Sequence, residues 1–165
     1  APAPDLGEDP RPTSATTTSL LDISETIIDH FDAELEGERP GKSLYEIAAS
    51  EDDTDRAVFS EYHAIGAVSG EFMLRKGDLK LIEYVGFEPE LFNLAEDPEE
   101  LTNQAQNPAY AGDLARMQAE LRKICDPDTV NTEAFEDQDA MIEFYGGKEA
   151  ASKLGAPSAT PPPAT

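Results

Sequence analysis

His63 is the best-placed titratable residue of the sequence. It follows a strand-like run at 57–62 and precedes a segment, 66–70, that glycines bound at both ends. Histidine changes charge close to neutral pH, and side chains on loops beside regular elements often carry function. Nothing beside His63 forms a recognisable catalytic triad. The sequence leaves two interpretations open, a binding role and a structural hydrogen bond. The other histidine, His30, lies beside an apolar helical stripe and is interpreted as structural or surface.

The acidic run at 51–55 has the composition of a calcium loop but not its spacing. Clustered carboxylates bind hard cations, and Asp53 and Asp55 have the required alternation. Ala57 stands where a third ligand belongs, and neither the sharp-turn glycine nor the closing glutamate of such a loop follows. We therefore interpret this run as a solvated acidic loop.

Cys125 is the single cysteine of the 165 residues. One cysteine excludes an internal disulfide and a cysteine-based zinc site.

The charge of the chain is strongly negative. It carries 35 acidic against 12 basic residues, a formal charge of −23. Nucleic acid and acidic membranes are disfavoured as partners, because both are bound through Lys and Arg. A salt-adapted surface and docking on a more basic protein both remain open. No apolar run approaches the roughly 20 residues that span a bilayer. The start at Ala1, without Met, suggests a processed, cut or truncated chain.

Three short runs at 72–76, 79–84 and 90–94 predict an antiparallel meander. Gly77 and Asp78 supply the tight turn between the first two runs. Apolar residues fall on both faces, with Leu74 and Leu81 opposed to Met73 and Ile82, so both faces of the sheet need cover. The run at 57–62 adds another strand.

Helical spacing predicts the covering elements. Apolar residues recur with helical period over 23–31, where Asp22 is expected to cap, and over 108–124. A short capped turn is expected at 44–49, and a helix start at Asp97, with Pro98 at the first position and Glu100 at the third. A further helix is expected over 132–145, ended by Gly146 and Gly147.

Several motifs occur in a defined order along these elements. They are Asp22-Ile23, Gly41-Lys42-Ser43-Leu44, Phe59-Ser60-Glu61-Tyr62, Arg75-Lys76-Gly77 with Lys80-Leu81-Ile82, and Glu90-Leu91-Phe92-Asn93-Leu94 with Asp97-Pro98-Glu99-Glu100 and Asn103. Together they resemble the C-terminal part of the sulfatase family, of arylsulfatase or choline-sulfatase type in the alkaline phosphatase superfamily. The resemblance covers roughly 20–124. Glu25 departs from it, since the family usually has proline there.

The resemblance implies an α+β fold, with a small antiparallel sheet of about four strands covered by a C-terminal amphipathic helix. This subdomain, expected at 20–125, would follow a linker or loop at 1–19 and precede a helical extension at 126–154 and a Pro-rich flexible tail at 155–165. Its implied partner is the larger sulfatase α/β domain, with a homo-oligomer possible for the complete enzyme.

The resemblance also implies hydrolysis of sulfate esters by a formylglycine nucleophile and a divalent cation, usually calcium. Both belong to the domain upstream, so we expect no catalytic residue, metal ligand or cofactor in this chain, and no activity from it alone. Cys125 lacks the Ser and Arg of the nucleophile motif. In the family the loop after the strand ending in Glu61 and Tyr62 reaches the pocket mouth, which makes His63 and Glu61 the candidate substrate-binding residues. Two alternatives remain: a non-catalytic acidic protein-interaction module, and part of a phosphonate or phosphate ester hydrolase.

Overall fold

A computed structural model describes residues 14–34, 37, 39–64 and 66–154. The predicted tail at 155–165 and most of the predicted linker lie outside the described residues. The elements in chain order are α1 (Leu20–His30), α2 (Leu44–Ala49), β1 (Val58–Tyr62), β2 (Glu71–Lys76), β3 (Leu79–Tyr84), β4 (Glu90–Asn93), the 3₁₀ helix η1 (Pro108–Tyr110), α3 (Ala111–Ile124), α4 (Pro127–Phe144) and α5 (Lys148–Leu154).

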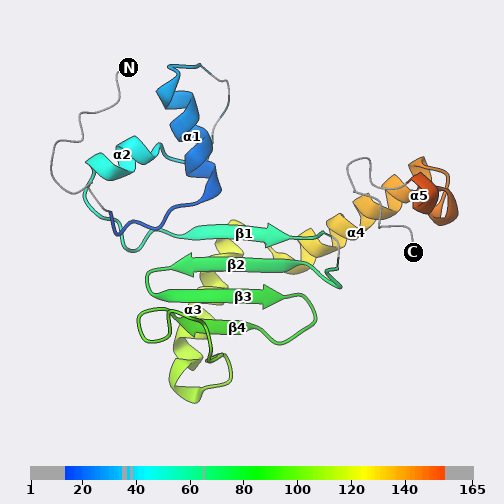
Figure 1. The fold of residues 1–165 in the computed structure, drawn as a ribbon. Coiled ribbons are helices and arrows are strands. Elements are labelled where there is room, and N and C mark those ends of the chain that lie inside the picture. The colour runs from blue at the N-terminus through cyan, green and yellow to red at the C-terminus, as the bar shows by residue number, and fades with distance from the viewer. Residues whose placement is uncertain (1–13, 35–36, 38, 65, 155–165) are drawn as a thin grey trace, which may run out of the picture.

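The four strands form one antiparallel sheet in the order β1-β2-β3-β4 (Figure 1). Gly77 connects β2 to β3 with a φ of 59°, a left-handed conformation that glycine adopts without steric cost. The pairing places Leu74 opposite Leu81 and Met73 opposite Ile82. The predicted meander and the predicted α+β class are therefore confirmed.

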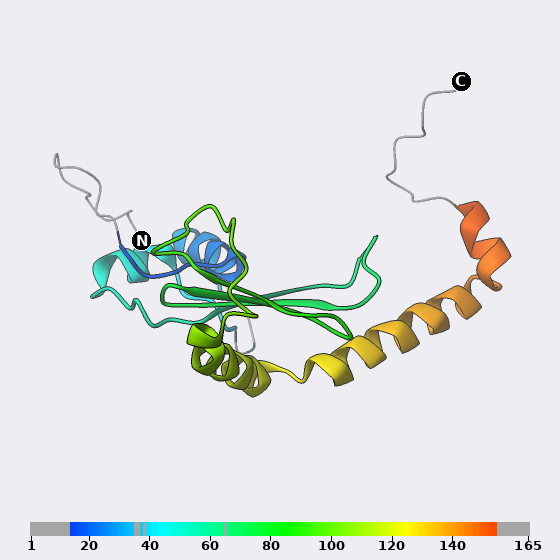
Figure 2. The same cartoon turned by 90° about the horizontal axis from the view of Figure 1, so that it is seen from below.

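Helix α3 covers one face of the sheet (Figure 2). Met117 and Leu121 of α3 have no exposed surface, and neither do the strand residues Leu74, Leu81 and Leu91. Burying one such side chain fully stabilises the fold by about 1.5–3 kcal/mol. This contact confirms the predicted cover by the amphipathic helix.

The opposite face of the sheet is only partly covered. Met73 and Ile82 are half-buried there and Arg75 is exposed, whereas Phe92 is buried. The loop after β4 reaches this face through Glu100, whose carboxylate lies 2.6 Å from the Lys80 ammonium. The seating of this face on a larger domain stays a prediction.

Helix α1 begins earlier than the sequence predicts. Ser19 is its N-cap, and Asp22 is the third helical residue, whose carboxylate accepts a hydrogen bond from the Ser19 N–H. The prediction that Asp22 is the cap is wrong, because the Ser19 side chain satisfies the first turn and frees Asp22 to face inward. Helices α1 and α2 contact each other beyond the β1 edge of the sheet (Figure 1).

The helix predicted to start at Asp97 is absent, and this segment forms turns. The Asp97 carboxylate accepts a hydrogen bond from the Thr102 N–H at 2.8 Å. Glu100 has a φ of 57°, which ends any helical run, since helical residues need negative φ. The Asn103 side chain then accepts from the Leu91 N–H at 3.0 Å and holds the segment against β4.

Helices α4 and α5 form an arm that projects from the sheet (Figure 2). Helix α4 begins at Pro127, five residues before the predicted start, because the Asp126 side chain caps it and proline suits its first turn. It ends before Gly146 and Gly147, as predicted, and both glycines have positive φ. Among the described residues, no helix has the length and apolar character that crossing a membrane would require.

Candidate functional site

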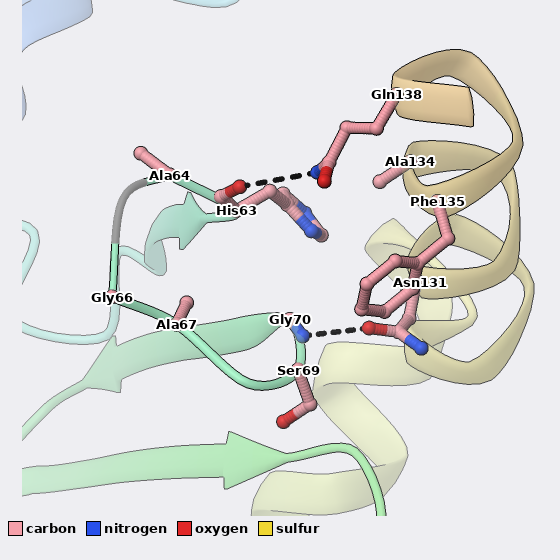
Figure 3. Close-up of a pocket in the computed structure, with 10 residues that line it drawn as sticks. All are labelled: His63, Ala64, Gly66, Ala67, Ser69, Gly70, Asn131, Ala134, Phe135 and Gln138. Atoms are coloured by element: carbon pink, nitrogen blue, oxygen red, sulfur yellow. Dashed lines mark hydrogen bonds between the residues drawn. The ribbon is translucent and has the colours of Figure 1, made fainter. Parts of the chain in front are cut away.

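A groove lies where the β1–β2 loop meets α4 (Figure 3). Its volume is about 450 Å³. The loop contributes His63, Ala64, Gly66, Ala67, Ser69 and Gly70, and the helix contributes Asn131, Ala134, Phe135 and Gln138. A glycine-rich loop on one side and a regular helix on the other thus define a concave site of the size that small ligands occupy.

His63 lies on the loop side of the groove. Its ring packs edge-on against Phe72 at 5.3 Å between centroids. The Nε2 atom is buried and has no hydrogen-bond partner among the described residues. A buried polar atom without a partner costs free energy, and this cost is the reason to examine His63 as a functional residue.

Gly70 sets the position of the His63 ring. A Cβ at residue 70 would come within 2.7 Å of His63 Cε1 and within 2.8 Å of the Phe72 ring. Distances this short are not tolerated, so the imidazole occupies space that only a glycine leaves free.

Glu61 lies beside His63 at the end of β1. Its Oε2 atom is 3.8 Å from His63 Nε2, a pair that is ionic only when the imidazole is protonated. The carboxylate is 43% exposed and the imidazole 21% exposed. The structure thus brings the two predicted site residues together. Whether they touch a substrate stays a prediction.

The helical wall of the groove was not predicted. The Asn131 side-chain oxygen accepts from the Gly70 N–H at 2.6 Å, and the Gln138 amide donates to the His63 carbonyl at 3.4 Å (Figure 3). Both bonds join residues more than 60 positions apart in sequence. In the sequence, the only signal of this wall was the helical spacing that places Asn131, Phe135 and Gln138 on one face of the helix.

Asp22 and Arg56 form a buried charge cluster away from the groove. Asp22 is fully buried and accepts four hydrogen bonds: two from the Arg56 guanidinium, one from the Ser19 N–H and one from the Lys42 N–H. The hydrogen bond from Arg56 is the main reason that the pKa of Asp22 falls well below its usual range, against the opposing effect of burial. The cluster connects α1 with the turn before α2, through Lys42, and with the segment before β1, through Arg56.

Gly41 fits the same junction. A Cβ there would lie 2.4 Å from the Leu21 carbonyl oxygen, so the chain segments meet where only glycine fits. The motifs around Asp22 and Gly41, separated in sequence, are therefore in contact, and their role in this chain is structural.

Two features of the described residues concern the metal and the nucleophile that the sulfatase resemblance implies, and the expectation that both belong to another domain stays a prediction. Among them no group of three or more His, Cys, Asp or Glu side chains could hold a metal ion. Cys125 is half-buried at the end of α3, and burial, followed by the charges of Glu61 and Asp126, raises the pKa of its thiol. A thiol of this kind is a poor nucleophile.

The sheet, its covering helix and the ordered motifs define the class of sulfatase C-terminal domains. Residues 8–126 match the family described as N-sulphoglucosamine sulphohydrolase, C-terminal, and the chain belongs to that family.

Relatives with known names are sulfatases several times longer than this chain. Arylsulfatase K of Danio rerio is 34% identical over 122 residues, which cover 68% of this chain and 23% of the relative. Choline-sulfatase of Rhizobium meliloti (strain 1021) is 37% identical over 108 residues, 63% of this chain and 21% of the relative. The chain therefore spans less than a quarter of either enzyme.

A solved structure shares the fold. The 2-O GAG sulfatase BT1596 superposes with a TM-score of 0.53 and 26% identity over 72% of this chain and 26% of that protein. This likeness supports the assignment to the class of sulfatase C-terminal domains.

Proposed function

We propose that this chain is the C-terminal domain of an enzyme that hydrolyses sulfate esters, and that it forms part of the substrate pocket through His63 and Glu61. The nucleophile, a formylglycine, and the divalent cation, calcium, would come from a larger α/β domain. The cation would stabilise the charge that builds up on the sulfate oxygens. The observation that supports a pocket role is the position of His63 on the groove beside the Glu61 carboxylate, with its buried Nε2 atom left without a partner among the described residues.

In this arrangement His63 donates or accepts a hydrogen bond at the organic part of the ester. Glu61 Oε2 lies 3.8 Å from His63 Nε2, so a substrate that contacts one of these side chains lies close to the other. Neither residue attacks sulfur, so both are substrate-positioning residues.

The test uses the full-length enzyme and one matched pair of variants. His63→Ala should lower kcat/KM for an aryl sulfate by about 10–100-fold, the loss expected for one hydrogen bond to a charged group. The control is His30→Ala, which removes the other histidine, bonded to Tyr45 on the exposed surface of α1. Thermal unfolding of both variants should match the parent, which separates binding from folding.

Two further results decide the enzyme assignment. Removal of calcium should abolish hydrolysis by the full-length enzyme, and the chain alone should show none. Full-length protein that is folded, calcium-loaded and inactive on sulfate esters would overturn the proposal. Parallel assays on a phosphonate monoester would then identify the alternative hydrolase, and inactivity on both would favour a non-catalytic interaction module.

A further inference from the structure

Helix α4 presents one face to the groove. Asn131, Ala134, Phe135 and Gln138 are spaced at i, i+3, i+4 and i+7, the positions that share a helical face. Figure 3 shows the rings of Phe135 and His63 directed into the space between the helix and the loop. This wall lies after residue 126, beyond the part of the chain that matches the sulfatase family.

Two amide side chains fix the helix against the loop. The Asn131 side chain accepts a hydrogen bond from the Gly70 N–H, and the Gln138 side chain donates one to the His63 carbonyl. Each bond uses one end of an amide that has both a donor and an acceptor. Position 138 therefore lies next to the backbone of His63, where a changed side chain acts directly on the groove.

The groove and its surroundings carry negative charge. None of the ten described residues that line the groove is Asp, Glu, Lys or Arg, so the negative charge comes from residues around the lining. Helix α4 holds six acidic residues and no basic one: Asp128, Glu133, Glu136, Asp137, Asp139 and Glu143. Glu61 adds a carboxylate at the His63 side. Carboxylates around an uncharged groove create a negative potential that attracts cations and repels anions.

Glu61 also lies close enough to Cys125 for its charge to act on the thiol. Burial is the main cause of the raised pKa of this thiol, and the Glu61 carboxylate adds to it. The negative charge of Glu61 therefore acts on groups around the end of β1.

We propose that the α4 face formed by Asn131, Phe135 and Gln138 is a specificity element of the pocket, which admits sulfate esters whose organic part is uncharged or cationic and rejects those with further negative charge. This inference rests on the proposed function, since it concerns the same groove. The Phe135 ring offers a surface on which an apolar or cationic group stacks favourably. A second sulfate or a carboxylate on the substrate meets no basic partner among the described lining residues.

The test is the full-length enzyme with a matched series of phenyl sulfates. The para substituent is trimethylammonium, acetamide or carboxylate, so the esters differ mainly in the charge of the organic part. We expect kcat/KM to be about tenfold or more lower for the carboxylate ester than for the cationic one at low salt. This difference should shrink toward 1 M salt, where the screening length falls to about 3 Å.

Gln138→Lys places a positive charge at the groove and should lower the cationic-to-carboxylate ratio of kcat/KM by about three- to tenfold. Comparing this ratio between variants cancels the intrinsic reactivity of each ester. The control is Gln106→Lys, the same substitution on the exposed loop after β4, where Gln106 bonds Glu88. Binding of the corresponding phenols, measured as competitive inhibition constants, should follow the same charge order.

The outcomes separate the two proposals. An enzyme that hydrolyses sulfate esters but prefers the carboxylate ester, or whose ratio is the same in Gln138→Lys and Gln106→Lys, refutes the specificity element and leaves the proposed function standing. An enzyme that hydrolyses none of the esters refutes both.

Discussion

Asp22 and Arg56 form a two-pronged ion pair across 34 residues of sequence, with Nη1–Oδ2 at 2.8 Å and Nη2–Oδ1 at 2.7 Å. The guanidinium fork matches the carboxylate in geometry, which makes such pairs strong and directional. The Arg56 Nη1 also donates to the Thr17 carbonyl, so the pair holds three segments at one point.

Replacing Asp22 by Asn should destabilise the domain by about 3–5 kcal/mol, because Arg56 is left as an uncompensated and largely buried charge. Urea unfolding followed by circular dichroism measures the change. Asp113→Asn is the matched control, since it breaks the exposed pair with Arg116 and should cost less than about 1 kcal/mol. Equal urea midpoints for the two variants would show that the buried pair contributes no more to the free energy of unfolding than the exposed pair does.

Acid should remove the advantage of the parent over Asp22→Asn. The folded state lowers the pKa of Asp22 below its unfolded value near 3.9, so the unfolded chain takes up the proton first. The contribution of the pair is therefore fully present above about pH 5 and declines as the pH falls toward the folded pKa. Unfolding midpoints of both proteins between pH 7 and pH 3 measure this. A gap that stays constant down to pH 3 contradicts it.

Tyr84 should be the last tyrosine to ionise. Burial, followed by the hydrogen bond that its hydroxyl donates to Glu90 at 3.0 Å, raises the pKa of Tyr84 to about 12. Absorbance at 295 nm should show a component near pH 12 that disappears in Tyr84→Phe. Because the folded pKa is raised, the stabilisation that it reports is present below about pH 10 and is lost as the pH rises toward 12. Glu90→Gln should move this component to lower pH, and an unmoved component would exclude Glu90 as a cause.

Cys125 should react slowly with iodoacetamide at pH 8, because burial and the charges of Glu61 and Asp126 raise the pKa of its thiol. Glu61→Gln removes one of these charges and should increase the alkylation rate about two- to threefold, because the pKa of the thiol falls. Asp113→Asn, at the other end of α3, is the control and should leave the rate unchanged. Mass spectrometry of the single cysteine gives the rate.

Gly70→Ala should impair the pocket by displacing the His63 ring while leaving the residue itself in the sequence. The added methyl would occupy the place of the His63 ring, and misplacement by about 1 Å can cost up to 100-fold in activity. Gly112→Ala is the matched control, because a Cβ there meets nothing within 4 Å and alanine favours the helix by about 0.5–1 kcal/mol. Full activity of Gly70→Ala on an aryl sulfate would mean that the His63 position is unimportant.

The sheet and α3 could be predicted because their signals are local. The short apolar-rich runs of β2 and β3, the glycine at Gly77 and the helical spacing that includes Met117 and Leu121 each occupy a single short segment. The false helix start arose in the same way: Asp97 and Glu100 have capping-box spacing, which also fits a turn in which Glu100 adopts a positive φ.

The contacts that join distant segments could not be predicted. The sequence around Arg56 does not indicate that it pairs with Asp22. The sequence around Asn131 likewise does not indicate its hydrogen bond with Gly70, 61 residues away. His63 and Glu61 were identified from the family resemblance and their place at the end of a strand. The helical wall opposite them is specified only by the three-dimensional fold.

The order of the strands has a consequence for how the domain forms. Each strand pairs with the strand that precedes or follows it in sequence, so the sheet has a low contact order. Hairpin closure takes only microseconds, and each new strand can add to an edge that is already made. We therefore expect the meander to assemble rapidly as it emerges from the ribosome. The slower steps would be those that bring residues more than 30 positions apart together, the Asp22–Arg56 pair and the docking of α4 on the β1–β2 loop.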